Sequence, residues 1–165
     1  MSRSSFCRFL AITAALAVGT IAPSSRVAIA EERPFMAAWT GNANLSETEI
    51  PWIMRNDETG EGEATHLGRF TWASVEFVDF SNFPPRVAVK ARFTMTAADG
   101  DRLCGRYKTV GLANEDGNLD ILGVFRFIGG TGRFADATGG GQLKATAFFA
   151  PGLPFEGEFS GTIDY

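Results

Sequence analysis

The chain has 165 residues, 45% of them hydrophobic, and its 19 acidic residues against 15 basic ones give a formal net charge of −4 at pH 7. An acidic surface repels nucleic acid and anionic lipid, so we expect neither as a partner. The chain has one histidine and two cysteines, too few to suggest a zinc site, and we expect no metal.

The first thirty residues have the pattern of a secretory signal peptide. Two arginines precede an apolar, alanine-rich stretch over residues 9–22, and Ala28-Ile29-Ala30 provides the small residues that precede a cleavage site. The apolar stretch is shorter than the roughly 20 residues of a membrane span, so a signal peptide is favoured over a retained anchor. We therefore predict a secreted or periplasmic protein without a membrane span after processing, and a mature chain over residues 31–165.

The mature chain is long enough for one domain with a hydrophobic core. Its 12 basic residues against 19 acidic ones make it more acidic than the whole chain, with a net charge of −7. Only Cys104 remains in it, so no internal disulfide can form and the domain depends on its core for stability.

Apolar and polar residues alternate along most of the mature chain, which is typical of strands with one buried face. The alternation is clearest over residues 155–163, where Phe, Gly, Phe, Gly and Ile occupy every second position. It also extends over residues 35–45, 87–97 and 141–149. Residues 65–80 form one long bent strand or two shorter ones in this interpretation, giving seven or eight strands.

Turn residues separate these strands. Asp99-Gly100 joins two of them as a hairpin, and residues 115–118 and 151–154 do the same further along. Sequential antiparallel strands form either a sandwich or a barrel. We favour a closed barrel, because alternating large and small inward residues suit a tapering interior.

Residues 46–63 are predicted to form a long irregular loop. Six acidic residues there surround an apolar patch, Ile50–Met54. A calcium site is conceivable, but the spacing matches no EF-hand, so a solvated acidic loop is favoured. The patch would cap one mouth of the barrel or, if exposed, bind a partner.

The glycine cluster over residues 128–139 contains G-x-G-x-x-A, a pattern found in dinucleotide-binding sites. A dinucleotide site needs a helix after the glycines, and the few residues between Gly132 and Gly139 leave barely one helical turn. We therefore expect no nucleotide cofactor. Gly129, Gly130, Gly132 and Gly139 instead indicate a strand reversal, with Phe134 and Ala135 plugging the end of the barrel.

Three stretches carry a family resemblance: "GGTGRFADATG" at 129–139, the closing F-x-G-x-F-x-G-x-I at 155–163, and "EATHLGRFT" at 63–71. Together they resemble the allene oxide cyclase and dirigent-protein barrels, especially their small secreted bacterial relatives. The resemblance implies a single, calycin-like, closed barrel of eight antiparallel strands with a hydrophobic cavity, and a homo-oligomer, often a trimer. Plant allene oxide cyclases isomerise a fatty-acid epoxide and dirigent proteins steer the coupling of phenols. No catalytic residue of either is carried over.

Three residues are candidate catalytic groups. His66 is the only histidine and a candidate acid or base, although a hydrogen-bonded structural role is favoured. Cys104, between Arg102 and Arg106, would be a reactive thiolate if those charges lowered its pKa, but a half-buried unreactive thiol is favoured. Glu76 would have a raised pKa if it faced inward, and the interpretation that we favour is an outward, solvated charge.

These observations favour an exported barrel that binds a small hydrophobic or aromatic ligand in its interior without catalysis. The candidate ligand-binding residues are inward aromatics, namely Trp39, Trp72, Phe93, Phe125 and Phe159. An isomerase or cyclase acting on a lipid-derived or phenolic substrate is the alternative, and it requires a polar group inside the barrel. A structural or interaction domain that uses the Ile50–Met54 patch or a trimer face is the third possibility.

Overall fold

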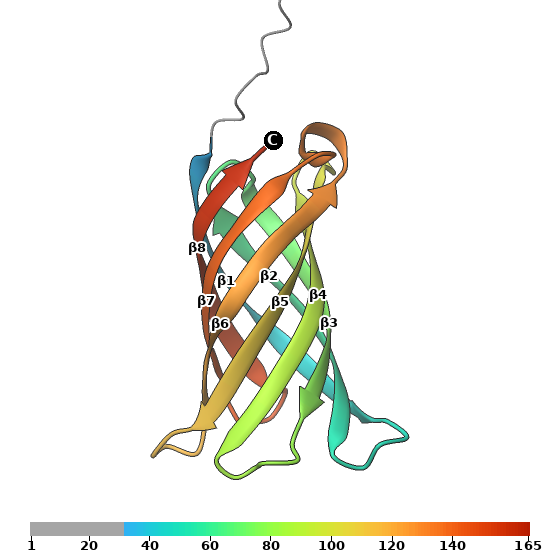
Figure 1. Cartoon of the computed structure of the whole chain (residues 1–165), viewed down its shortest axis with the longest axis vertical. Coiled ribbons are helices and arrows are strands. Elements are labelled where there is room, and N and C mark those ends of the chain that lie inside the picture. Colours follow the sequence, from blue (N-terminus) through green and yellow to red (C-terminus); the bar gives the residue numbers. More distant parts are fainter. Residues whose placement is uncertain (1–31) are drawn as a thin grey trace, which may run out of the picture.

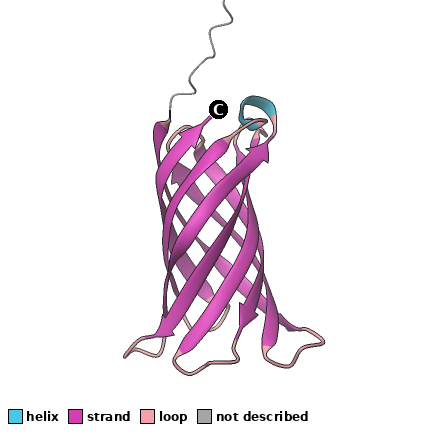
Figure 2. Cartoon of the chain, in the orientation of Figure 1, coloured by secondary structure: helices cyan, strands magenta, loops and turns pink. Residues whose placement is uncertain are grey.

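The computed structural model describes residues 32–165, which form one closed barrel of antiparallel strands (Figure 1). Each strand pairs with the next in sequence, and the last pairs with the first (Figure 2). The strands are β1 (Arg33–Glu47), β2 (Ile53–Ala64), β3 (Gly68–Asp79), β4 (Arg86–Ala97), β5 (Arg102–Ala113), β6 (Leu119–Gly130), β7 (Thr138–Ala147) and β8 (Pro154–Asp164), with one short 3-10 helix, η1 (Gly132–Phe134).

The prediction of an all-β, eight-stranded antiparallel closed barrel is confirmed. The predicted signal peptide, residues 1–30, lies outside the described residues. Among residues 32–165, no helix is long and apolar enough to cross a membrane.

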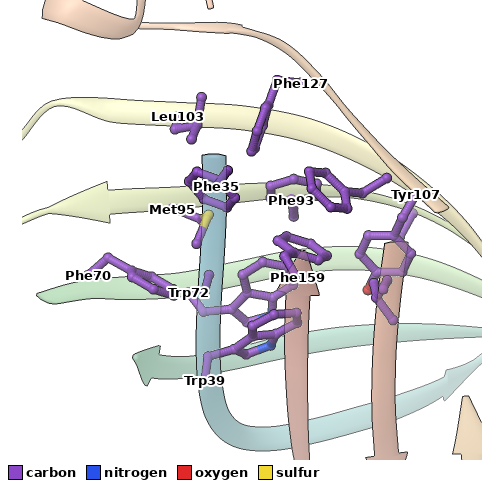
Figure 3. Packing of buried hydrophobic residues seen from close by; sticks show 14 of the residues in the cluster. Phe35, Trp39, Phe70, Trp72, Phe93, Met95, Leu103, Tyr107, Phe127 and Phe159 are labelled. Atoms are coloured by element: carbon purple, nitrogen blue, oxygen red, sulfur yellow. The ribbon is translucent and has the colours of Figure 1, made fainter. Parts of the chain in front are cut away.

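Aromatic rings fill much of the interior because glycines face them. A Cβ atom at Gly157 would lie 2.6 Å from the Trp39 ring, and one at Gly105 would lie 2.2 Å from the Phe93 ring. Each of these glycines therefore makes room for a neighbouring ring, and the rings meet in the middle of the barrel (Figure 3). The large and small alternation in the sequence thus marks the inward positions.

The predicted turns join the strands as expected. Gly100 and Gly117 have positive φ angles of 91° and 79° in the loops after β4 and β5, and residues 148–153 separate β7 from β8, which begins at Pro154. The glycine cluster is a strand reversal between β6 and β7. There Gly130 lies so close to the Arg102 carbonyl oxygen that an added Cβ atom would be 1.9 Å away.

The predicted irregular loop over residues 46–63 is wrong, because β1 continues to Glu47 and β2 begins at Ile53. The four inward positions in the middle of β2, from Asn56 to Gly62, are polar or lack a side chain, which hides the apolar alternation of an ordinary strand. At Gly62, for example, a Cβ atom would lie 2.6 Å from the Trp39 Cβ atom. The eighth strand is therefore this acidic segment, and residues 65–80 supply only one strand.

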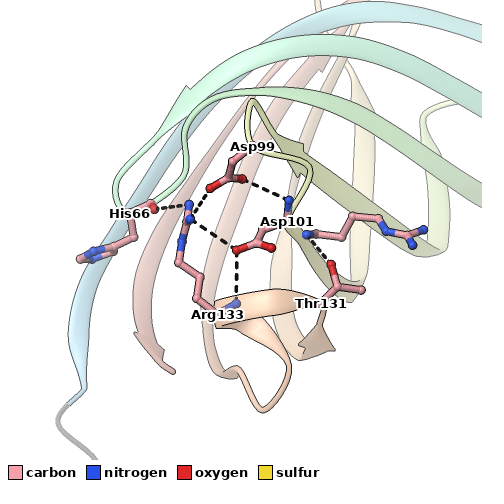
Figure 4. A network of polar contacts seen from close by, with 6 residues as sticks. His66, Asp99, Asp101, Thr131 and Arg133 are labelled. Carbon is pink, nitrogen blue, oxygen red and sulfur yellow. Dashed lines mark hydrogen bonds and ion pairs between the residues drawn. The ribbon is translucent and has the colours of Figure 1, made fainter.

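One end of the barrel, which we name the Phe134 end, is closed. Phe134 is fully buried and packs against Tyr165, the last residue of the chain. Ala135 is exposed, so it does not plug the barrel as predicted; the 3-10 helix turns it outward, and Ala137 is buried instead. Arg133 holds the loop in place through Asp99, at 2.5 Å, and Asp101, at 3.4 Å (Figure 4).

The opposite end, formed by the loops after β1, β3, β5 and β7, is less filled. Its inward positions include buried large side chains, such as Leu119 and Phe155, and small ones that are only partly buried, namely Ala43, Ala113, Ala145 and Ala147. Inward residues of the Phe134 end, such as Phe35, Leu103 and Ile163, have no exposed surface. Solvent thus reaches the small inward side chains at the rim of the opposite end.

We predict that Phe134→Ala lowers the free energy of unfolding by about 3–5 kcal/mol, because it removes a fully buried ring and leaves a cavity. Urea denaturation followed by tryptophan fluorescence measures this change. Phe149→Ala is the control, since Phe149 is half exposed and its loss should change stability by less than about 1 kcal/mol. Equal effects of the two substitutions would contradict the role of Phe134 as a plug.

Candidate functional site

Two carboxyl groups project into the barrel from adjacent strands. Asn56 of β2 lies opposite Glu76 of β3, and Glu58 lies opposite Ser74 one pair further along. All four are inward positions, because they alternate with outward residues on both strands. With Tyr107 of β5, these residues form what we call the carboxyl cluster.

Glu76 is held by two hydrogen-bond donors. The Tyr107 hydroxyl donates to Glu76 Oε1, and Asn56 Nδ2 donates to Glu76 Oε2 at 2.7 Å. Tyr107 can reach Glu76 from two strands away because the residue between them in the register is the small Ala91. Only 6% of Glu76 is exposed, so its carboxyl group depends on these two donors.

Glu58 accepts hydrogen bonds from the other side of the cluster. Ser74 Oγ donates to Glu58 Oε2 at 2.8 Å, and Trp72 Nε1 donates to the same oxygen at 3.2 Å. The Asn56 amide also approaches Glu58 Oε1 at 3.3 Å, so it bridges the two carboxyl groups. Glu58 is partly rather than fully buried, which makes it the more accessible of the pair.

Burial raises the pKa of both carboxyl groups. The pKa of Glu58 rises to about 8, chiefly through desolvation and then through the charge of Glu76, against the opposing effect of its hydrogen bonds. Desolvation also raises the pKa of Glu76, while Tyr107 and Asn56 lower it. The pKa of the Tyr107 hydroxyl is raised too, by desolvation and the nearby carboxylates, so Tyr107 stays a hydrogen-bond donor at neutral pH.

Three buried polar atoms in the barrel have no hydrogen-bond partner among the described residues: Trp39 Nε1, Asn56 Oδ1 and Thr109 Oγ1. One of them belongs to the carboxyl cluster itself. A buried polar group without a partner is unfavourable by about 1–3 kcal/mol, and most such groups in proteins are satisfied. The interior therefore offers unused donors and acceptors to a small polar group.

The five aromatic residues predicted to bind a ligand do point inward, but they pack against one another. Trp39 and Trp72 stack with centroids 4.6 Å apart, Phe125 and Phe159 stack at 4.1 Å, and Phe93 lies 5.1 Å from Trp72. They form a continuous aromatic wall, of which Figure 3 shows Trp39, Trp72, Phe93 and Phe159. The wall meets the carboxyl cluster where Trp72 Nε1 donates to Glu58. Their first role is to fill the barrel.

The three candidate catalytic residues lie far apart in the fold. Glu76 faces inward, so the outward orientation that we favoured is wrong; the β3 register turns it to the same face as Trp72 and Ser74. His66 is exposed in the turn after β2, where its Nε2 contacts the Pro34 carbonyl oxygen at 3.0 Å. Cys104 is half-buried on the outer face of β5, and its sulfur lies 3.8 Å from Thr94 Oγ1.

Sequence reasoning missed most of the carboxyl cluster. Asn56 and Glu58 were assigned to a loop, and neither Ser74 nor Tyr107 was considered. Glu58 lies two residues before Gly60 and four before Gly62, so all three fall on the same face of a strand. This spacing could have identified Glu58 as an inward residue. Within the apolar patch Ile50–Met54, Ile50 and Trp52 are about half exposed.

Within residues 32–165, no group of three or more histidine, cysteine, aspartate or glutamate side chains is arranged to hold a metal ion. Comparison with family models, with curated proteins and with solved structures finds no match for this chain. The chemistry of the site therefore rests on its geometry.

We predict that the free energy of unfolding falls as the pH rises from about 5 to about 8. Because the folded pKa of Glu58 is raised from 4.5 to about 8, the folded state keeps a proton that the unfolded state releases in this range. The loss of stability is on the order of 3 kcal/mol. Glu58→Gln should reduce this dependence, whereas Glu61→Gln, at an exposed outward position of the same strand, should preserve it. Urea titrations at several pH values measure it, and an unchanged slope in Glu58→Gln would contradict the assignment.

Proposed function

We propose that the protein is an isomerase or cyclase that acts by general acid–base catalysis on a small, largely apolar substrate bound in the barrel. The observation that carries this proposal is the pair of carboxyl groups, Glu58 and Glu76, set among aromatic rings and hydrogen-bonded to Tyr107, Asn56 and Ser74. Perturbed titratable groups in an apolar interior are typical of catalytic sites.

Glu58 is the acid in this proposal. With a pKa of about 8 it is protonated at neutral pH, and a catalytic group works best when its pKa is near the working pH. It gives its proton to an oxygen of the substrate, which weakens a neighbouring bond, and the resulting carboxylate takes a proton back from the rearranged molecule. The reaction has no net gain or loss of atoms, as an isomerisation requires.

Glu76, Asn56 and Tyr107 hold Glu58 in its working state. The charge on Glu76 raises the pKa of Glu58 and so keeps its proton in place. Asn56 fixes the relative position of the two carboxyl groups by approaching both. Its unpaired Oδ1 atom is an acceptor that a hydroxyl group of the substrate would satisfy.

The substrate enters from the end opposite Phe134, where several inward side chains are small and partly exposed. The walls around the cluster favour an apolar body with one or two oxygen atoms, which matches a lipid-derived or phenolic molecule. The resemblance to the allene oxide cyclase and dirigent barrels supports the same substrate classes, and the leader-like first thirty residues support export.

The test is turnover of an unsaturated fatty-acid epoxide, with product isomers separated by chiral chromatography. We expect one isomer in excess, and a rate that falls as Glu58 loses its proton near pH 8. Glu58→Gln should reduce the rate by about 10²–10⁴-fold, whereas Glu61→Gln should have no effect. Wild-type turnover by Glu58→Gln, or no turnover of the epoxide, would overturn the proposal.

Binding without catalysis is the second candidate, and the unpaired Trp39 Nε1 and Thr109 Oγ1 atoms favour it. A carrier would use these groups to hold the polar end of a ligand that it releases unchanged. Native mass spectrometry of the exported protein distinguishes the two candidates: a carrier retains an unmodified ligand, and its affinity survives Glu58→Gln.

A further inference from the structure

Five basic residues form a compact group on the outside of the barrel, away from the carboxyl cluster. Arg92 of β4 lies opposite Arg106 of β5, which lies opposite Arg126 of β6, and Lys90 lies opposite Lys108 in the next row. All five point outward and are exposed. We name this group the basic rows.

The basic rows form no ion pair among the described residues. The ion pairs of residues 32–165 are Arg55–Asp57 and the contacts of Arg133 with Asp99 and Asp101, and none involves the basic rows. Like charges directly opposite each other on neighbouring strands destabilise a sheet. The basic rows bring five like charges together although this is unfavourable for folding. Such a group indicates a surface that binds an anionic partner.

Apolar side chains border the basic rows on both sides. Val75 and Phe77 of β3 lie at one border and Val124 of β6 at the other, in register with the basic residues. They are 38%, 51% and 60% exposed. Together with the basic rows they line an open groove of about 1200 Å³ that continues over Gly139–Gly141 of β7, where no side chains fill it.

The rest of the molecule limits what this groove can bind. Without the basic rows, residues 31–165 carry 7 basic residues against 19 acidic ones. A membrane surface or a nucleic-acid duplex would extend beyond the groove and meet this negative charge within a Debye length of about 8 Å. The partner is therefore a short anionic segment, and the apolar borders require apolar groups at its two ends.

We propose that the groove binds an extended acidic peptide segment of a partner protein, in which apolar residues flank two or three acidic ones. Phe77 and Val124 are three strand spacings apart in the register, roughly 14 Å. An extended peptide crosses that length in about four residues. The segment thus has apolar residues at its first and fifth positions and carboxylates between them. Lys90 and Lys108 lie between Phe77 and Val124 in the register, and the arginines lie beside these lysines in the adjacent row, so both rows face the carboxylates.

The test is fluorescence anisotropy with the labelled peptide Phe-Asp-Glu-Asp-Val added to the purified protein. Two further peptides serve as probes of the motif: Phe-Asn-Gln-Asn-Val lacks the charges, and Ser-Asp-Glu-Asp-Ser lacks the apolar ends. We expect each of them to bind at least about tenfold more weakly than the first peptide, and all binding to weaken as salt is raised.

The double variant Arg92→Gln/Arg106→Gln should also weaken binding of the first peptide by about tenfold or more. Arg69→Gln/Arg86→Gln is the matched control, because both arginines are outward on β3 and β4 but do not line the groove. Removing the like charges of the basic rows should not lower thermal stability, so loss of binding in the first variant would not reflect unfolding.

Four outcomes would overturn the proposal. The first is absence of binding by the Phe-Asp-Glu-Asp-Val peptide, and the second is equal binding of the serine-flanked peptide, which would indicate a nonspecific ionic surface. The third is tighter, Arg106-dependent binding to phosphatidylglycerol vesicles. The fourth is self-association in sedimentation experiments that Arg92→Gln/Arg106→Gln abolishes, because the groove would then be filled by a second copy of the chain. None of these readouts involves Glu58, so they leave the proposed catalysis to its own test.

Discussion

Pairing of β8 with β1 is the constraint on which the rest of the structure depends. Once the sheet is closed, the number and stagger of the strands set the width of the interior, and every inward side chain must share that fixed space. This is why Trp39 faces Gly157 and why Phe93 covers Gly105. The glycines are therefore part of the core, since each one accommodates a ring from a neighbouring strand.

The same constraint places the two carboxyl groups. Ala91 is small enough for Tyr107 to reach across it to Glu76, and the β2–β3 register brings Glu58 beside Ser74. A charged carboxylate in such surroundings is unfavourable unless it is hydrogen-bonded, and five donor contacts meet the pair. The barrel thus holds a polar site that is rigid and surrounded by apolar walls, a combination that stability alone does not require.

The sequence predicts the fold better than the site, for a physical reason. The alternation of apolar and polar residues can be read within each strand without knowledge of its neighbours. The strands with apolar inward residues, and the turns between them, are therefore identified correctly. The orientation of Glu76 is missed because β3 reverses the usual pattern there: the polar Ser74 and Glu76 face inward, whereas Val75 and Phe77 face outward. β2 itself is hidden because Asn56, Glu58, Gly60 and Gly62 occupy its inward positions. Phe134 was expected to close the barrel because it interrupts a glycine cluster, whereas the burial of Ala137 depends on how η1 turns.

Both chain termini of the barrel lie at the Phe134 end, where Arg33 pairs with Ile163 (Figure 1). A tag, a fusion partner or a surface linked to either terminus is thus attached at the plugged end. The interior would then still open toward the solution on the far side, one barrel length away. The protein can accordingly be immobilised by its terminus with a defined orientation and an unobstructed mouth.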